Sequence, residues 1–322
     1  MKRTALTVFA SLAFALAACS STTTTDGGSG GGTSSGGTTG GTAPGDGGIS
    51  ITLSSIGIAP EAVAALAALP KPVTPPSLAN GYQVILQAVT LSGTSAKLTD
   101  VGAVKLDSSN DTGPITFSHL SFAGGIAALG VISAVIPQAD GGLLNDAGTV
   151  GAGWPSCSDL YGDGGGPGIN EDGGFQDYLV VAASQVHFGP PTGDIANGVS
   201  YAIPASYAAL LDCAAGQAPG TFVNGGMALA YVSSQAAGGG TPVSGVTLSG
   251  NIAANQLYYA AGYGAGSATA TPPTSSNGVV SVTNNGQPST FSAKDSSGTT
   301  YGSLDLATAQ GSIYQVFYSP GL

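Results

Sequence analysis

Short runs of alternating or β-branched apolar residues recur along most of the chain. Gly, Pro, Asn or Asp bounds each run, and runs of this kind are typical of half-buried β-strands. The clearest predicted strands are residues 82–89, 115–120, 178–182, 227–232, 243–248 and 313–318.

Two stretches carry helix signals instead. Residues 60–69 begin with Pro60, have Glu61 in the first turn and are followed by Pro70, which favours a short helix. Residues 204–215 have the same character, with Gly216 as the C-terminal stop. Neither segment is long enough to organise a helical bundle. The predicted fold class is therefore all-β, with Greek-key β-sandwich modules and two short helices.

The N-terminal end has the pattern of an export signal. Lys2 and Arg3 precede an uncharged apolar stretch, residues 5–18, which is shorter than the roughly 20 residues that span a bilayer and typical of a signal peptide. The stretch ends Leu-Ala-Ala-Cys at residues 16–19 and resembles the bacterial lipobox. The resemblance implies that Cys19 is lipidated and becomes the mature N-terminus. An ordinary secretory signal with an incidental cysteine is the alternative.

The lipobox resemblance also indicates where the chain is retained. Ser20 follows the cysteine, and by the usual enterobacterial rule this implies an outer membrane lipoprotein, on the periplasmic face or at the cell surface. Residues 20–48 are almost entirely Gly, Ser and Thr with no large apolar side chain, so they predict a disordered linker. The expected organisation is a signal peptide at 1–18, a lipid-anchored linker at 19–48, a β-rich domain at 49–224 and a second domain at 225–322.

Composition narrows the class of partner. The 322 residues include 53 Gly, and Asp and Glu number 17 against 6 Lys and Arg. This acidity argues against nucleic acid as a ligand, and a hydrophobic content of 42% argues against a wholly disordered chain. Residues 140–212 hold nine acids and no Lys or Arg. The membrane, through the anchor, and a carbohydrate or protein ligand are the partners expected.

The last hundred residues resemble a known family. Residues 240–248 read GTPVSGVTL, similar to the opening of carboxypeptidase regulatory-like (transthyretin-like) domains. A Thr- and Ser-rich segment and an Asn-Gly turn follow within residues 274–282, and residues 291–293 and 313–318 would supply closing strands. Independently of the resemblance, the Asn-Gly pair predicts a hairpin, because these residues favour the tight turns that join antiparallel strands. The resemblance implies a non-catalytic β-sandwich module over residues 225–322, with a generic immunoglobulin-like sandwich as the alternative.

Two cysteines remain after lipidation of Cys19. Cys157 and Cys213 would lie in an oxidising compartment after export, which favours a disulfide between them. Two free thiols, or a catalytic cysteine, are the alternatives. A disulfide here would enclose the acidic, glycine-rich segment between them.

That acidic segment is a candidate calcium site. Calcium takes oxygen ligands from Asp, Asn and backbone carbonyls, and Gly permits the turns that converge them. The candidate ligands are Asp159, Asp163, Asn170, Asp172 and Asp177. The first ligand and the closing Glu of an EF-hand are missing, so a solvated loop without metal is the alternative, and no cofactor is otherwise expected.

The other polar and aromatic residues give weaker signals. His119 and His187 lack metal-ligand spacing, and His119 is expected as a satisfied histidine within a sandwich. Trp154 lies beside Cys157 and is expected in the core, with stacking on a sugar as the alternative. The sequence thus predicts a non-catalytic, lipid-anchored envelope protein with a binding, adhesion or structural role. The alternative is an envelope or polysaccharide hydrolase that uses carboxylates in residues 159–177.

Overall fold

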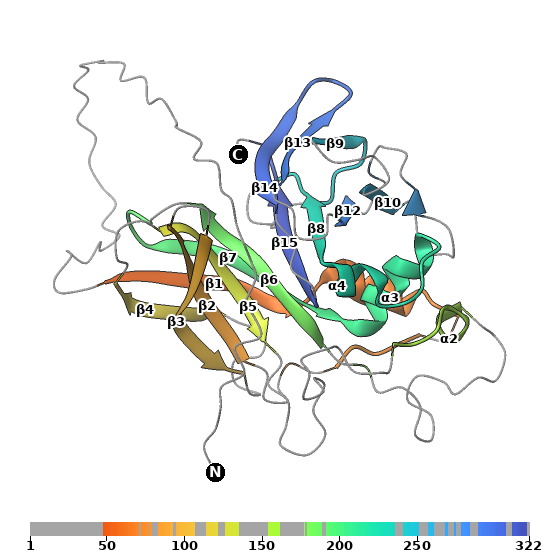
Figure 1. Cartoon of the computed structure of the whole chain (residues 1–322), viewed down its shortest axis with the longest axis horizontal. Helices are drawn as coiled ribbons and strands as arrows, with labels where there is room; N and C mark the ends of the chain where they lie inside the picture. Colours follow the sequence, from red (N-terminus) through yellow and green to blue (C-terminus); the bar gives the residue numbers. More distant parts are fainter. Residues whose placement is uncertain are drawn as a thin grey trace, which may run out of the picture.

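A computed structural model gives the structure of this chain. It describes residues 48–70, 72–76, 78, 83–92, 95–106, 114–121, 126–134, 154–161, 177, 179–188, 191–235, 241–250, 257–260, 268–269, 274, 278–283, 289–306 and 311–320. Within these residues the chain is mostly β-structure with four short helices (Figure 1). The predicted β class is therefore confirmed. Cys19 and the linker lie outside the described residues.

The strands follow in chain order. In the first part they are β1 (Ile49–Ile58), β2 (Gln83–Ser92), β3 (Ser95–Lys105), β4 (Ile115–Leu120), β5 (Ile126–Ala134), β6 (Leu179–Phe188) and β7 (Ile195–Pro204). In the second part they are β8 (Met227–Val232), β9 (Val246–Gly250), β10 (Leu257–Ala260), β11 (Ala268–Thr269), β12 (Val279–Thr283), β13 (Ser289–Asp295), β14 (Thr300–Leu306) and β15 (Ser312–Tyr318). The helices are α1 (Pro60–Ala67), α2 (Cys157–Tyr161), α3 (Ala205–Ala214) and α4 (Thr221–Gly225).

One large sheet runs through the molecule in the order β11-β10-β12-β8-β15-β6-β5-β2-β3. At β6 it branches, because β6 also pairs with β7, which pairs with β1, which in turn pairs with β4. A separate three-stranded sheet has the order β14-β13-β9. The large sheet contains strands from both sides of the expected domain boundary between residues 224 and 225. This is because β15 pairs with β6 of the first part as well as with β8 of the second.

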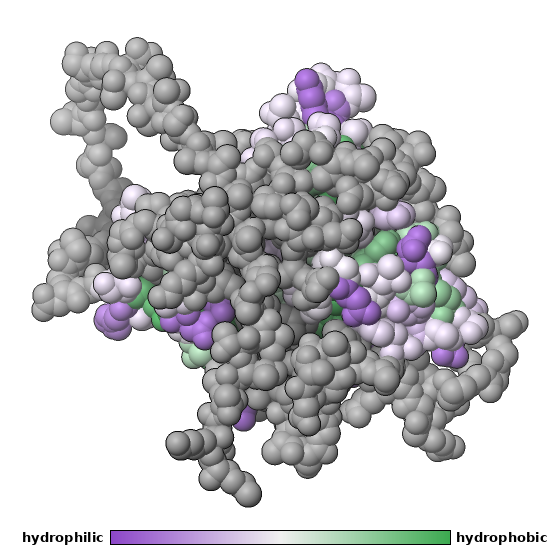
Figure 2. Space-filling model, in the orientation of Figure 1, coloured by the Kyte–Doolittle hydropathy of each residue, from purple (hydrophilic) through white to green (hydrophobic). Residues whose placement is uncertain are grey.

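The alternation along β8 explains the layers. Met227, Leu229 and Tyr231 belong to the core beneath the helices, whereas Ala228 and Ala230 belong to the core shared with the three-stranded sheet. Successive side chains of a strand point to opposite faces, so the large sheet here has helices on one face and a second sheet on the other. The second sheet projects as the β13–β14 hairpin, whose tip carries hydrophilic residues (Figures 1 and 2).

A third core joins the strands of the first part. It contains Ile51 and Leu53 of β1, Phe117 of β4, and Val84 and Leu86 of β2. These residues recur at every second position of their strands, so β1 and β4 pack face to face with β2. This part of the chain is again a sheet-on-sheet packing.

Both predicted helices are present. Helix α1 has Pro60 in its first turn, and its buried residues Ala62, Ala65 and Leu66 lie three and four positions apart, the spacing of one helix face. All ten residues of α3 are buried, and Gly216 follows it with a φ of 71°. Helices α2 and α4, five residues each, were not predicted because each is too short to give a periodic signal.

Parallel strand pairs are the main departure from the Greek-key expectation. β1 pairs in parallel with β7, and β15 pairs in parallel with both β6 and β8. Parallel neighbours need long crossover connections, and the chain between β1 and β7 and between β8 and β15 supplies them. The predicted Asn277–Gly278 hairpin is wrong, because the following strand β12 pairs with β8 and β10.

His119 lies at a bulge and not inside a sandwich. The register between β1 and β4 shifts between Ile49 and Ile51, and His119 has a φ of 57°, the left-handed region that non-glycine residues rarely adopt. Its side chain is exposed. The prediction of a satisfied sandwich histidine is therefore wrong, because the bulge places the extra residue outside and lets Leu120 face the core.

Candidate functional site

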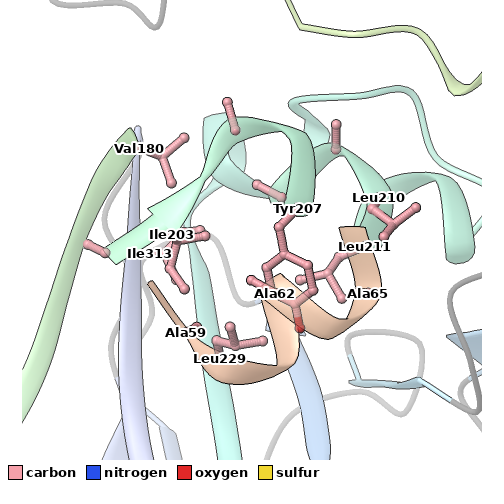
Figure 3. Close-up of a cluster of buried hydrophobic side chains, with 14 of the residues drawn as sticks. Ala59, Ala62, Ala65, Val180, Ile203, Tyr207, Leu210, Leu211, Leu229 and Ile313 are labelled. Atoms are coloured by element: carbon pink, nitrogen blue, oxygen red, sulfur yellow. The ribbon is translucent and has the colours of Figure 1, made fainter. Parts of the chain in front are cut away.

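The best candidate region is the helical layer, by which we mean α1, α2, α3 and α4 packed on β8 and β15. Tyr207 of α3 is fully buried at its centre. Its ring lies beside Ala62 and Ala65 of α1, in one cluster with Leu229 of β8 and Ile313 of β15 (Figure 3). The small alanines let α1 approach α3 closely enough to enclose the tyrosine.

A disulfide links two helices of this layer. Cys157 of α2 and Cys213 of α3 are bonded, with an S–S distance of 2.02 Å and a Cα–Cα distance of 5.6 Å. The predicted disulfide is therefore confirmed. Cys213 is buried and Cys157 half-buried, so α2 is held against the core of the helical layer by a covalent bond.

Asp212, which precedes Cys213, is a buried carboxyl that the sequence did not single out. Its side chain is 0% exposed. The amide of Gly220 donates to its Oδ2 at 2.7 Å, and the amide of Phe222 donates to its Oδ1 at 2.9 Å. Burial raises the pKa of Asp212 to about 7, against the lowering effect of hydrogen bonds from the backbone of residues 220–222. The carboxyl thus joins the end of α3 to the start of α4.

Asp177, one of the candidate calcium ligands, is buried and holds the start of α3. The backbone N–H of Ser206 donates to its Oδ1 at 3.0 Å, and the Ser206 hydroxyl donates to its Oδ2 at 2.5 Å. Pro204 stands at the N-cap and makes no side-chain cap, so a carboxylate from a distant segment supplies the cap. A negative charge at a helix N-terminus is also favourable for the helix dipole.

Asp159, a second candidate ligand, has a comparable local role. The amide of Ser156 donates to Oδ2 of Asp159 at 3.0 Å, and the amide of Asp159 donates to the Ser156 hydroxyl at 3.1 Å. This reciprocal pair is a capping box at the start of α2. The two candidate calcium ligands that lie among the described residues, Asp159 and Asp177, are therefore both engaged in helix caps.

The rest of the proposed calcium site lies outside the described residues, namely Asp163, Asn170 and Asp172. Among the described residues, no group of three His, Cys, Asp or Glu side chains is placed to hold a metal ion. The calcium site thus stays a prediction for the undescribed segment.

Glu61, in the first turn of α1, is a half-buried carboxyl of the helical layer. Burial raises its pKa, and a hydrogen bond with Tyr231 of β8 lowers it in part. The Tyr231 ring stacks on Phe317 of β15, with ring centroids 5.2 Å apart, and the Tyr201 ring meets Phe317 edge-on at 5.9 Å. The sequence marked Glu61 only as a first-turn residue, since its burial depends on where α1 packs.

The single tryptophan packs against the corner between α3 and α4. A Cβ atom at Gly220, which has a φ of 84°, would lie 2.5 Å from Nε1 of Trp154. Trp154 is half-buried against the core of the helical layer, in agreement with the expected core position. The side chain of His187, on β6, lies outside the described residues.

Comparisons with known proteins add little to this geometry. No family model matches the chain, and no curated protein matches it in sequence. Among solved structures, the chain is similar to GBS52, the minor pilin in the Gram-positive pathogen Streptococcus agalactiae, with 10% identity and a TM-score of 0.21, over 85% of this chain and 97% of that one. A likeness at this level assigns neither family nor function. Within the described residues, none of the helices has the length and hydropathy needed to cross a bilayer.

Proposed function

We propose that this chain is an exported, lipid-anchored protein of the bacterial cell envelope with a non-catalytic binding, adhesion or structural role. The disulfide between Cys157 and Cys213 is the observation that carries the proposal, because disulfides persist in oxidising compartments outside the cytosol. The signal-like N-terminus and the lipobox resemblance at Cys19 agree with export. The outer membrane is the proposed destination.

The roles of the described acids support a non-catalytic reading. Asp159 and Asp177, the two described members of the candidate catalytic segment, are engaged in helix caps. A glycosidase instead needs two carboxyl groups facing the same substrate bond. The buried Asp212 likewise accepts backbone amides of its own helical corner.

The C-terminal sandwich fits a spacer or binding module. Its core is formed by β8, β12 and β15 on one side and by β9 and β13 on the other. We propose that this part is related to carboxypeptidase regulatory-like domains, on the strength of the GTPVSGVTL segment and the two-sheet packing.

Fractionation of the full chain tests the anchor. The wild-type protein should be recovered with the membranes and should incorporate a labelled fatty acid, whereas Cys19→Ser should lose the label and become soluble outside the cytoplasm. Cys157→Ser is the matched control, because it removes a cysteine without touching the anchor and should keep the label. An unlabelled wild-type protein would overturn the anchor, and free thiols at Cys157 and Cys213 in the native protein would overturn export.

A further inference from the structure

The helical layer holds several carboxyl groups and no basic side chain. Glu61, Asp177 and Asp212 are buried wholly or in part, and Asp159 lies at its edge. Among the described residues, the donors to Asp212 are the backbone amides of Gly220 and Phe222. Burying a carboxylate without a cation beside it costs free energy, and this cost favours the protonated carboxyl.

Asp212 is the most enclosed of these groups, and the described elements that pack on α3 bring no Lys or Arg to it. Helix α2 brings Asp159 and Tyr161 to this side of the layer, α1 brings Glu61, and β7 brings Tyr201. Helix α4 contains no titratable residue. None of these elements contains Lys or Arg, nor does β6, whose His187 side chain lies outside the described residues.

The position of Asp212 makes the helical layer depend on it. Its two oxygens hold the amides of Gly220 and Phe222. Gly220 lies under the indole of Trp154, and the Phe222 ring enters the core 4.9 Å from the ring of Tyr258. This one carboxyl therefore fixes the turn between α3 and α4, and with it the packing of α4 on the rest of the layer.

We infer that the corner between α3 and α4 is a pH-sensitive device in which proton uptake by Asp212 stabilises the packed helical layer. A protonated carboxyl keeps acceptor capacity on its oxygens, so the bonds from Gly220 and Phe222 survive neutralisation. The uncompensated charge is removed at the same time.

The direction of the effect follows from linkage. The pKa of Asp212 is about 7 in the folded chain and near 3.8 when unfolded, so the folded state binds the proton more tightly. The stabilisation is fully present below pH 3.8 and is lost as the pH rises through 7. The protein should therefore be more stable in mildly acidic than in alkaline solution.

The single tryptophan provides the measurement. Trp154 is the only Trp of the chain and lies on Gly220, so its fluorescence reports on this corner. In the mature, oxidised protein we expect a fluorescence transition with a midpoint near pH 7, and a fall in Tm of about 5 °C between pH 5 and pH 8.

Asp212→Asn should abolish both the transition and the fall in Tm, and Asp159→Asn, at the neighbouring helix cap, should retain both. If Asp212→Asn does not fold, amide exchange at Gly220 and Phe222 in the wild type decides. Corrected for intrinsic rates, their protection should decrease from pH 5 to pH 8, with the amide of Leu248 in the other sheet as reference. A Tm that rises over this range, no transition in the wild type, or a transition that persists in Asp212→Asn would each overturn the inference.

Discussion

The hydroxyl of Tyr259 satisfies both backbone groups of Leu248. It accepts a hydrogen bond from the Leu248 amide at 3.0 Å and donates to the Leu248 carbonyl at 3.2 Å. Thr274 does the same for Val246, whose amide donates to the Thr274 hydroxyl and whose carbonyl accepts from the Thr274 amide. The outer edge of β9 is thereby covered, as an edge strand must be to avoid pairing with another chain.

Tyr259→Phe should therefore destabilise the C-terminal sandwich. The change leaves the buried amide and carbonyl of Leu248 without the hydroxyl, which costs about 1–3 kcal/mol for a buried polar group. Urea unfolding should show the loss. Tyr258→Phe is the matched control, with an expected change within about 0.5 kcal/mol. Equal stability of the two variants would contradict this role of the Tyr259 hydroxyl.

Gly220→Ala should be among the most damaging single substitutions in the helical layer. The new Cβ would lie 2.5 Å from Nε1 of Trp154, and the residue has a φ of 84°, so clash and backbone strain add. We expect a loss of about 2–4 kcal/mol. Gly216→Ala tests strain alone, because Gly216 has a φ of 71° and no atom within 4 Å of its Cβ position; it should cost about 1 kcal/mol. Thermal unfolding followed by Trp154 fluorescence compares the two.

At the bulge of β4, glycine should be preferred over alanine. His119 has a φ of 57°, and a left-handed conformation costs a residue with a Cβ about 1–2 kcal/mol relative to glycine. His119→Gly should be more stable than His119→Ala by about 1 kcal/mol. At Ser118, which precedes the bulge residue, the order should reverse, since glycine weakens an ordinary strand position. Chemical denaturation of the four variants tests this, and the same order at both positions would refute it.

The tip of the β13–β14 hairpin should respond to acid in the opposite sense to Asp212. Hydrogen bonds from the Ser297 side chain, and from Thr299, Tyr301 and the Ser297 backbone, lower the pKa of Asp295 to about 2. The stabilisation is present above pH 3.8 and is lost as the pH falls through 2. Titration of the Asp295 carboxyl by NMR should show this pKa. Ser297→Ala should raise it, whereas Ser303→Ala, on the same hairpin, should leave it unchanged.

Local patterns predicted the elements whose signals lie within a few residues. The alternation of residues 115–120 corresponds to β4, and residues 227–232 correspond to β8. Pro60 and Gly216 mark the start of α1 and the residues after α3. The two cysteines that remain after the expected lipidation of Cys19, in a chain predicted to be exported, sufficed to predict the bond between Cys157 and Cys213.

Other features depended on contacts between distant segments. Nothing local to β15 indicates that its neighbours are β6 and β8, because all seven of its residues are buried and its partners come from distant segments of the chain. The sequence suggested Asp177 as a candidate calcium ligand. In the structure it caps α3, because the fold places Ser206 beside it.

The sequence by itself thus determined the β class and the start of α1, because these depend on short-range periodicity and residue type. It favoured the disulfide through the number of cysteines and the expected compartment. The tertiary structure alone decided which carboxyls are buried. Burial raises the pKa of Asp212 to about 7, because β-strands and three other helices remove it from water, and its donors among the described residues are neutral backbone amides. Solvation of a side chain is a property of its surroundings, and those surroundings come from segments that are distant along the chain.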